Sequence, residues 1–287
     1  MMKRFQIGRL IFAMTAATLP ILAARGDTLA DTALQRAKKE GSIRIGYSNA
    51  IPPAYKSADG RVTGEDVEIA RSIAKKLGIN KVDSILTEWG SIVPGLKAER
   101  IDLTMAMYIT PKRCEQIAFS DPIYRLGEAM LVPQGNPKSI KDLSTFAENK
   151  DLKLAVVTGA VEVDYAKIAG IDQSQLLVLR DNTSLLAAVQ SGRADAGALP
   201  AIQLIEMAKK VTGIEVTPQY FEVAGKPVEG YGAFGFRKED RDLLEAFNQE
   251  LKTFLGSSEH LAIVTPFGFG KNTLPGKKTT AELCAGK

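Results

Sequence analysis

Histidine, cysteine and tryptophan are scarce in this chain of 287 residues, which contains one His, two Cys and one Trp. Structural zinc sites are built from Cys and His ligands, and the sequence does not supply enough of them. Acidic residues at the spacing of a calcium-binding loop are also missing. We therefore expect no metal site and no cofactor.

The common motifs of catalysis are absent as well. No GxSxG sequence occurs. The segment nearest to a phosphate-binding loop, "GFGKNT" at 268–273, has Thr265 where the first glycine should stand. His260 lies in a helix-like context, where a surface or locally bonded side chain is expected. The sequence therefore favours binding over catalysis.

No apolar run is long enough for an ordinary membrane span. The longest one near the start covers residues 10–24 and contains Pro20, whereas a span needs about 20 apolar residues. It follows Lys3, Arg4 and Arg9 and is followed by small residues, which is the pattern of a secretory signal peptide. We predict a signal peptide at residues 1–26 and export to the periplasm, with a permanent anchor as the less favoured alternative.

The excess of positive charge comes from the predicted signal peptide. The whole chain has 37 Lys and Arg against 33 Asp and Glu, and removal of residues 1–26 leaves 33 of each sign. A neutral exported protein gives no reason to expect nucleic acid or an anionic membrane as a partner.

The two cysteines, Cys114 and Cys284, both belong to the exported part. In an oxidising compartment the simplest expectation is one disulfide, and the alternative is two buried thiols that never meet. Cys284 lies in a polar C-terminal tail, which such a bond would fasten.

Strand-like and helix-like runs alternate from Ser42 onward, which predicts an α/β protein with mainly parallel sheets. In the first series, strands are expected at 43–47, 81–89 and 101–108 and helices at 67–78 and 91–100. In the second series, strands are expected at 152–159, 176–180 and 194–200 and helices at 161–170, 183–192 and 201–211.

The C-terminal part is too short for a third unit of this kind. A strand at 231–238 and an amphipathic helix at 240–256, with Asp240 as its N-cap, are expected to return to the first unit. We therefore predict one lobe from 42–131 plus 236–287 and a second lobe from 132–235. Two chain crossings between them would form a hinge.

Several residues have the chemistry of a ligand site. Arg113 follows a strand, where ligands collect in open α/β sheets, and its guanidinium can grip a carboxylate; a solvated surface Arg is the plainer alternative. The turn at Gly159 offers backbone N–H groups, although ordinary strand-to-helix turns look the same. Tyr55, Trp89 and Tyr108 fall at strand ends or in loops, where they could face a ligand or fill the core.

Four segments in order resemble the extracellular solute-binding proteins of ABC importers, specifically the polar amino-acid family, family 3. They are "IPPAYKSADGRVTGEDVEIARSIAKKLG", "EWGSIVPGLKAERIDL", "YITPKRCEQIAFSDPIY" and "SGRADA". The resemblance implies a two-lobed clamshell (type II) with a two-strand hinge. It also implies that Arg113 binds the ligand's α-carboxylate, that Tyr108 lines the pocket, and that Gly159, Ala160 and Val161 form a second carboxylate-binding loop.

One departure from the family concerns the ligand's cation. Members usually place an aspartate after "GRADA" for the ligand's ammonium group, but this chain reads "GALPAIQ", with Leu199 followed by Pro200. Burying an unpaired ammonium costs several kcal/mol. Either another anion lies nearby, or the ligand's cation is delocalised.

The "LP" sequence, the aromatic residues Trp89 and Tyr108, and the closing "TTAELCAG" resemble the ectoine and hydroxyectoine binders of the family. Those proteins carry an acidic residue before the double proline and an aromatic directly after it. Here Ile51 and Ala54 occupy these positions.

The predicted function is that of a monomeric periplasmic binding protein that delivers a small amino-acid-like zwitterion to a membrane permease and its ATPase. Two alternatives remain from the sequence. One is a periplasmic enzyme on the same clamshell, such as a dehydratase of a cyclic acid, and the other is a ligand-sensing receptor module.

Overall fold

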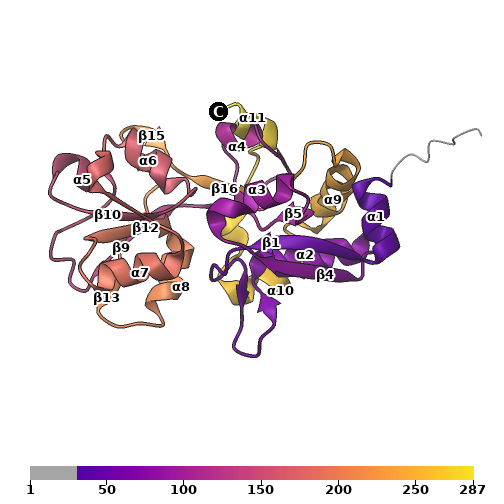
Figure 1. Cartoon of the computed structure of the whole chain (residues 1–287), viewed down its shortest axis with the longest axis horizontal. Helices are drawn as coiled ribbons and strands as arrows, with labels where there is room; N and C mark the ends of the chain where they lie inside the picture. Colours follow the sequence, from indigo (N-terminus) through magenta and orange to yellow (C-terminus); the bar gives the residue numbers. More distant parts are fainter. Residues whose placement is uncertain (1–30) are drawn as a thin grey trace, which may run out of the picture. The chain divides into compact units, whose positions relative to one another are not determined.

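The structure, a computed structural model, describes residues 31–287, and the predicted signal peptide lies outside the described residues. In this part of the chain, no helix combines the length and the apolar character needed to cross a bilayer. The two α/β units expected from the sequence are present, and each is built on its own sheet (Figure 1).

The first unit contains a parallel sheet of three strands in the order β4-β1-β5. These strands are β1 (Ser42–Tyr47), β4 (Lys81–Leu86) and β5 (Leu103–Thr104). The surrounding helices are α1 (Ala33–Glu40), α2 (Glu65–Lys76), η1 (Trp89–Ser91) and α3 (Ile92–Lys97). Helix α2 forms because Val67, Ala70, Ile73 and Ala74 recur at helical spacing and are buried together.

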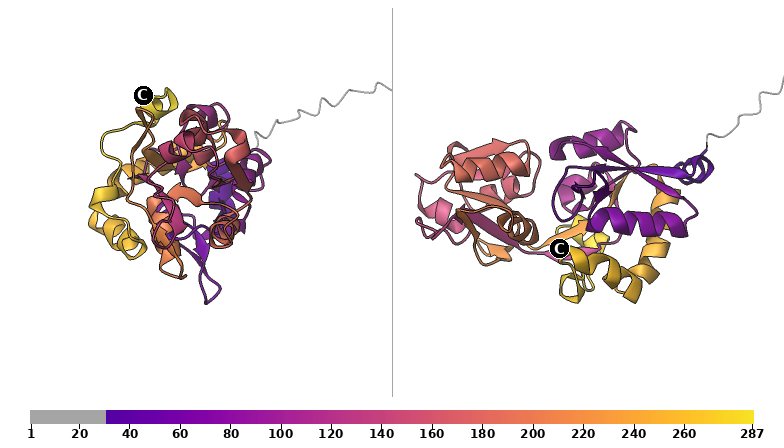
Figure 2. Two further views of the ribbon diagram at one scale, coloured as in Figure 1. Left: turned by 90° about the vertical axis from the view of Figure 1, so that its left-hand side faces the viewer. Right: turned by 90° about the horizontal axis from the view of Figure 1, so that it is seen from below.

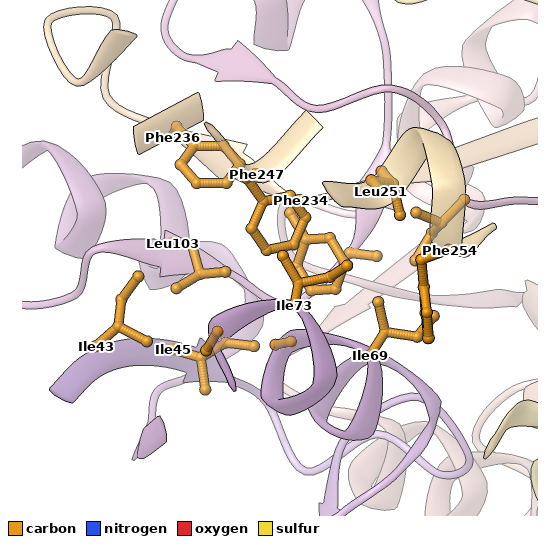
Figure 3. Close-up of a cluster of buried hydrophobic side chains, with 14 of the residues drawn as sticks. Ile43, Ile45, Ile69, Ile73, Leu103, Phe234, Phe236, Phe247, Leu251 and Phe254 are labelled. Atoms are coloured by element: carbon orange, nitrogen blue, oxygen red, sulfur yellow. The ribbon is translucent and has the colours of Figure 1, made fainter. Parts of the chain in front are cut away.

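The C-terminal helices complete the core of this unit. They are α9 (Arg241–Phe254) and α10 (Ser258–Val264), and both contact α2. Phe247 packs edge-on against Phe234 and Phe236, with ring centroids 5.1 and 5.4 Å apart. Figure 3 shows these rings above the isoleucines of β1 and α2. Segments from opposite ends of the chain therefore bury one hydrophobic cluster.

The second unit contains a sheet of five strands in the order β11-β10-β12-β9-β13. Strand β9 runs antiparallel to its neighbours β12 and β13, while β10 pairs parallel with β11 and β12. The elements are β9 (Glu128–Pro133), α5 (Ser144–Glu148), β10 (Leu154–Val157), α6 (Glu162–Ile168), η2 (Gln173–Gln175), β11 (Leu176–Leu179), α7 (Asn182–Gln190), β12 (Ala196–Pro200), α8 (Ala201–Ala208) and β13 (Ile214–Val216). Strands β10 and β12 are buried throughout, as the apolar runs predict.

Two segments connect the units, and Figure 2 shows them running side by side. Strand β16 (Gly230–Ala233) lies between β6 (Met107–Tyr108) and β8 (Tyr124–Leu126). Strand β8 continues through Gly127 into β9, and β16 follows the hairpin of β14 (Glu222–Val223) and β15 (Lys226–Pro227). We propose that the chain passes between the lobes near Gly127 and Glu229, close to the limits expected from the sequence.

Shorter elements support the first unit. They are β2 (Tyr55–Lys56), β3 (Val62–Thr63), α4 (Pro111–Cys114), β7 (Ala118–Phe119), β17 (Gly235–Phe236), η3 (Thr265–Phe267), η4 (Lys271–Thr273) and α11 (Thr280–Cys284). Helix α11 lies beside α4 (Figure 1), and a disulfide joins Cys114 to Cys284. The predicted bond is therefore present, and the C-terminal tail is fastened to the helix that carries Arg113.

Asp240 differs from its expected role. It precedes α9, but its side chain does not cap the helix and instead lies 2.6 Å from Nη2 of Arg237. Arg237 is buried and also donates to the carbonyl of Ile101. A buried guanidinium needs a counter-charge more than a helix end needs a cap, so the ion pair prevails.

Candidate ligand-binding site

A cavity of about 280 Å³ is lined by residues of both units. From the first unit it receives the segments that follow β1, β4 and β5, and from the second unit those that follow β10, β11 and β12. The carboxyl ends of parallel strands thus face the same cavity from two sheets, and this is the edge at which open α/β sheets bind ligands.

Arg113 is held by a short capped helix. The Thr110 hydroxyl accepts a hydrogen bond from the Arg113 backbone N–H at 3.2 Å, and Pro111 occupies the first helical position. The guanidinium donates from Nη1 to the carbonyl of Tyr108 at 2.8 Å and from Nη2 to the carbonyl of Gly159 at 3.0 Å. Arg113 therefore bonds the first unit to the second, and its remaining N–H donors are available for a ligand.

Burial lowers the pKa of Arg113 from its ordinary value, since desolvation opposes the charged form. Its guanidinium carbon lies 5.6 Å from the ring centre of Trp89, a distance suited to a cation–π contact. A partly desolvated Arg with spare donors in a cavity wall is a strong site for a carboxylate.

Two glycines allow the units to come together beside Arg113. A Cβ on Gly90 would lie 3.3 Å from the carbonyl oxygen of Thr158, and one on Gly159 would lie 3.2 Å from the Gly90 Cα. Gly159 also has a φ of 76°, which favours glycine. This close approach places the Gly159 carbonyl within reach of Arg113.

Tyrosine rings form another part of the wall. Tyr108 and Tyr124 both line the cavity, and a Cβ at Gly230 or Gly232 would overlap their rings. The glycines at these two positions of β16 therefore leave the space that the two rings occupy.

A pair of buried carboxyl groups adjoins the same cavity. Glu162, the first residue of α6, lines it and is 2% exposed, and Glu128 in β9 is fully buried. Glu128 is the cross-strand partner of Pro200, so the two side chains lie on the same face of the sheet. An acid therefore stands directly beside the position where the family resemblance predicted an aspartate.

The two carboxyls are unfavourable to ionise together. Among residues 31–287, no hydrogen bond reaches Oε1 or Oε2 of Glu128 or Oε2 of Glu162. Burial raises the pKa of Glu162 to about 7, and burial together with the charge of Glu162 raises the pKa of Glu128 well above its ordinary value.

This pair should make the ligand-free protein less stable at higher pH. The raised pKa means that the folded state keeps a proton which the unfolded state releases near pH 4.5. The corresponding stability is fully present below about pH 4.5 and is lost as the pH rises through about 7.

We expect Glu128→Gln to raise the free energy of unfolding at pH 8 by about 1 kcal/mol, because its amide donates to Glu162 without requiring a bound proton. The gain should shrink toward pH 5. Urea unfolding at both pH values measures it, with Glu245→Gln on the exposed face of α9 as control. A variant less stable than the wild type at pH 8 would contradict this account.

The residues proposed from the sequence separate into three groups. Arg113, Tyr108, Trp89, Val161 and Leu199 line the cavity. Gly159 instead lines a second cavity, which Arg113 also touches. Tyr55 lies outside both cavities, on β2, where Nζ of Lys210 is 5.9 Å from its ring centre.

Sequence reasoning missed Glu128, Glu162 and Tyr124. The acids carried a signal, since Glu128 is the one charge in the apolar run "GEAMLVP" and Glu162 follows "VVTGAV". Charged residues in such positions are seldom buried without a partner or a function. Within residues 31–287, no group of three or more potential metal ligands comes together.

Comparison with known proteins places this architecture among binding proteins. The model of the bacterial extracellular solute-binding proteins, family 3, matches residues 43–270. A probable amino-acid ABC transporter periplasmic-binding protein of Sinorhizobium fredii, y4tE, is 33% identical over 259 residues, which are 88% of this chain and 86% of that protein. The lysine/arginine/ornithine-binding periplasmic protein of Escherichia coli is 27% identical, over 73% of this chain and 81% of its own length.

Solved structures show the same fold. The crystal structure of EhuB in complex with hydroxyectoine aligns with a TM-score of 0.81 and 33% identity, covering 89% of this chain and 98% of that one. The ancestral amino acid-binding protein AncCDT-1, a precursor of cyclohexadienyl dehydratase, aligns with a TM-score of 0.71 and 28% identity, covering 82% and 98%.

Proposed function

The chain belongs to family 3 of the bacterial extracellular solute-binding proteins, and from this premise we propose that it captures a small zwitterion in the periplasm and delivers it to an ABC permease and its ATPase. The observation that supports this most directly is the position of Arg113. Its guanidinium lines the cavity and bonds carbonyl groups of both units. A carboxylate bound there would be held where the two lobes meet.

We assign the ligand to amino acids and their cyclic derivatives. Similar proteins are described as binding hydroxyectoine or basic amino acids. In this proposal Arg113 binds the carboxylate, and the faces of Trp89 and Tyr108 contact the cationic or apolar body. Val161 and Leu199 form the opposite wall. Contacts in both lobes shift the equilibrium toward the closed form, which the permease recognises in a monomeric protein.

A thermal-shift screen tests this function. We expect a raised melting temperature with at least one of hydroxyectoine, L-arginine, L-lysine, L-glutamine and L-histidine, since a ligand at about 100 times its Kd adds about 2.7 kcal/mol to folding stability. Acetate at the same concentration serves as the control for a carboxylate alone. Absence of any shift with all five zwitterions would contradict the proposal.

A periplasmic dehydratase is the second candidate, and the specific observation in its favour is Glu162. Its pKa of about 7 suits a general acid, and it lines the cavity. Release of water from a bound cyclic acid, followed by NMR, would establish this activity. An unchanged ligand recovered after prolonged incubation supports transport instead.

A further inference from the structure

The carboxyl of Glu162 differs from the other acids of the cavity wall. Asp181 accepts a hydrogen bond from the backbone N–H of Ser184 at 2.7 Å and pairs with Arg180 at 3.0 Å. Glu88 is exposed to solvent. Glu162 is buried, and its Oε2 has no donor in the described part of the chain.

The groups around Glu162 do not neutralise it. They come from several elements and are Glu128, Arg113, Tyr108, Tyr165 and Tyr220. Arg113 is the cation of this group and its charge favours ionised Glu162, but two of its N–H groups are bonded to backbone carbonyls. Glu128 adds a second carboxyl rather than a counter-charge.

Such a pair is costly in a protein that only needs to fold. Removing a carboxylate from water without a partner costs several kcal/mol, and two adjacent carboxyls repel each other unless they hold a proton. Glutamine would fill the same volume without that cost. The retained acids therefore indicate a cation that is absent from the chain itself.

We propose that the Glu162 carboxyl, with Glu128 behind it, binds the cationic end of the zwitterion whose carboxylate Arg113 holds. This rests on the proposed function and narrows its ligand class. The unsatisfied oxygens require hydrogen-bond donors, so the preferred cation is an ammonium or amidinium with N–H groups. A quaternary ammonium such as that of glycine betaine offers none and is bound more weakly.

The position of the pair fits this role. Glu128 is opposite Pro200 across the β9–β12 ladder, and Pro200 lines the cavity together with Glu162. The two acids thus reach one point from a strand and from the start of a helix, on the wall of the second unit. Arg113 belongs to the first unit, so the two ends of the ligand would contact different lobes.

Cation binding should release a proton near neutral pH. The ligand favours the ionised form of Glu162, whose pKa is about 7 in the empty site. Affinity for an N–H-bearing zwitterion should therefore rise about tenfold from pH 6 to pH 8, in proportion to the ionised fraction.

Isothermal titration calorimetry tests the proposal with hydroxyectoine, L-arginine, L-glutamine and glycine betaine as probes. The best-bound N–H-bearing probe should lose at least about tenfold in affinity in Glu162→Gln. Titration at pH 7 in two buffers of different ionisation enthalpy should show proton release in the wild type and little in the variant. Glu162→Asp should recover part of both effects, and Glu245→Gln should match the wild type.

The outcomes separate this inference from the proposed function. If no probe binds the wild type, both are overturned. If an N–H-bearing probe binds the wild type but Glu162→Gln keeps its affinity within twofold, the cation site alone is overturned. If Glu162→Gln does not fold, measurements on the wild type test the inference instead. Ligand binding without proton release would overturn it. Glycine betaine binding as tightly as the best N–H-bearing probe would also overturn it.

Discussion

Replacement of Arg113 by Ala is expected to weaken ligand binding by at least about 2 kcal/mol, roughly 30-fold in Kd. The guanidinium has two tasks at once. Its free N–H groups would pair with the ligand's carboxylate, and Nη1 and Nη2 already hold the carbonyls of Tyr108 and Gly159. The variant therefore loses the ligand's partner and a direct link between the lobes.

Calorimetry with the ligand found by screening measures this loss. Arg113→Lys should lie between the wild type and the Ala variant, because it keeps the charge without the planar fork. Arg241→Ala, at an exposed position at the start of α9, is the matched control. An Arg113→Ala protein with unchanged affinity would refute the assignment of the carboxylate site.

Replacing both Cys114 and Cys284 by Ser should lower the free energy of unfolding by about 3 to 5 kcal/mol. The disulfide spans a sequence separation of 170 residues, and it limits the freedom of the unfolded chain over that length. The folded state is less dependent on it, because α11 keeps its capping box of Thr279 and Glu282 and a hydrogen bond from Thr280 to the Ser120 carbonyl at 2.8 Å.

Ligand affinity should change far less than stability in this double variant. Arg113 is adjacent to Cys114, yet its position also depends on the Thr110 cap and on the Tyr108 carbonyl. We expect a change in Kd of less than about threefold, or about 0.65 kcal/mol. Urea unfolding and calorimetry on the same preparation test both statements. A large loss of affinity with little loss of stability would show that the disulfide mainly positions Arg113.

Most of the helices and strands can be predicted from the sequence, because the spacing of apolar residues follows the geometry of each element. The run at 101–108 is an exception, since its apolar pattern predicts one strand but the chain forms β5 and β6 there. Between them, the Ala106 N–H donates to Oδ2 of Asp66 at 2.9 Å, and the chain leaves β1 to pair with β16. A change of partner sheet is decided by residues far away in the chain, so periodicity does not reveal it.

The residues of the site divide in the same way, into those that one short motif predicts and those that only the folded chain brings together. Arg113 and Tyr108 belong to one short motif, so they were found together. Glu128 and Glu162 are separated by a strand and a helix, and they meet through the register of β9 with β12 and the start of α6. Tyr55 is an aromatic residue near a loop, like Trp89, but it lies outside the cavity, with Nζ of Lys210 5.9 Å from its ring centre. The distance between residues along the sequence does not show which side chains reach the cavity.

The close approach of Gly90 to the backbone of Thr158 and Gly159 also limits how the two units can be altered. A methyl group added there is expected to push the two backbones apart, because packed interiors leave little room for an extra carbon atom. The Gly159 carbonyl accepts a hydrogen bond from Arg113, so this displacement would also disturb the guanidinium. The spacing of the two units and the geometry of the proposed carboxylate site are therefore expected to change together.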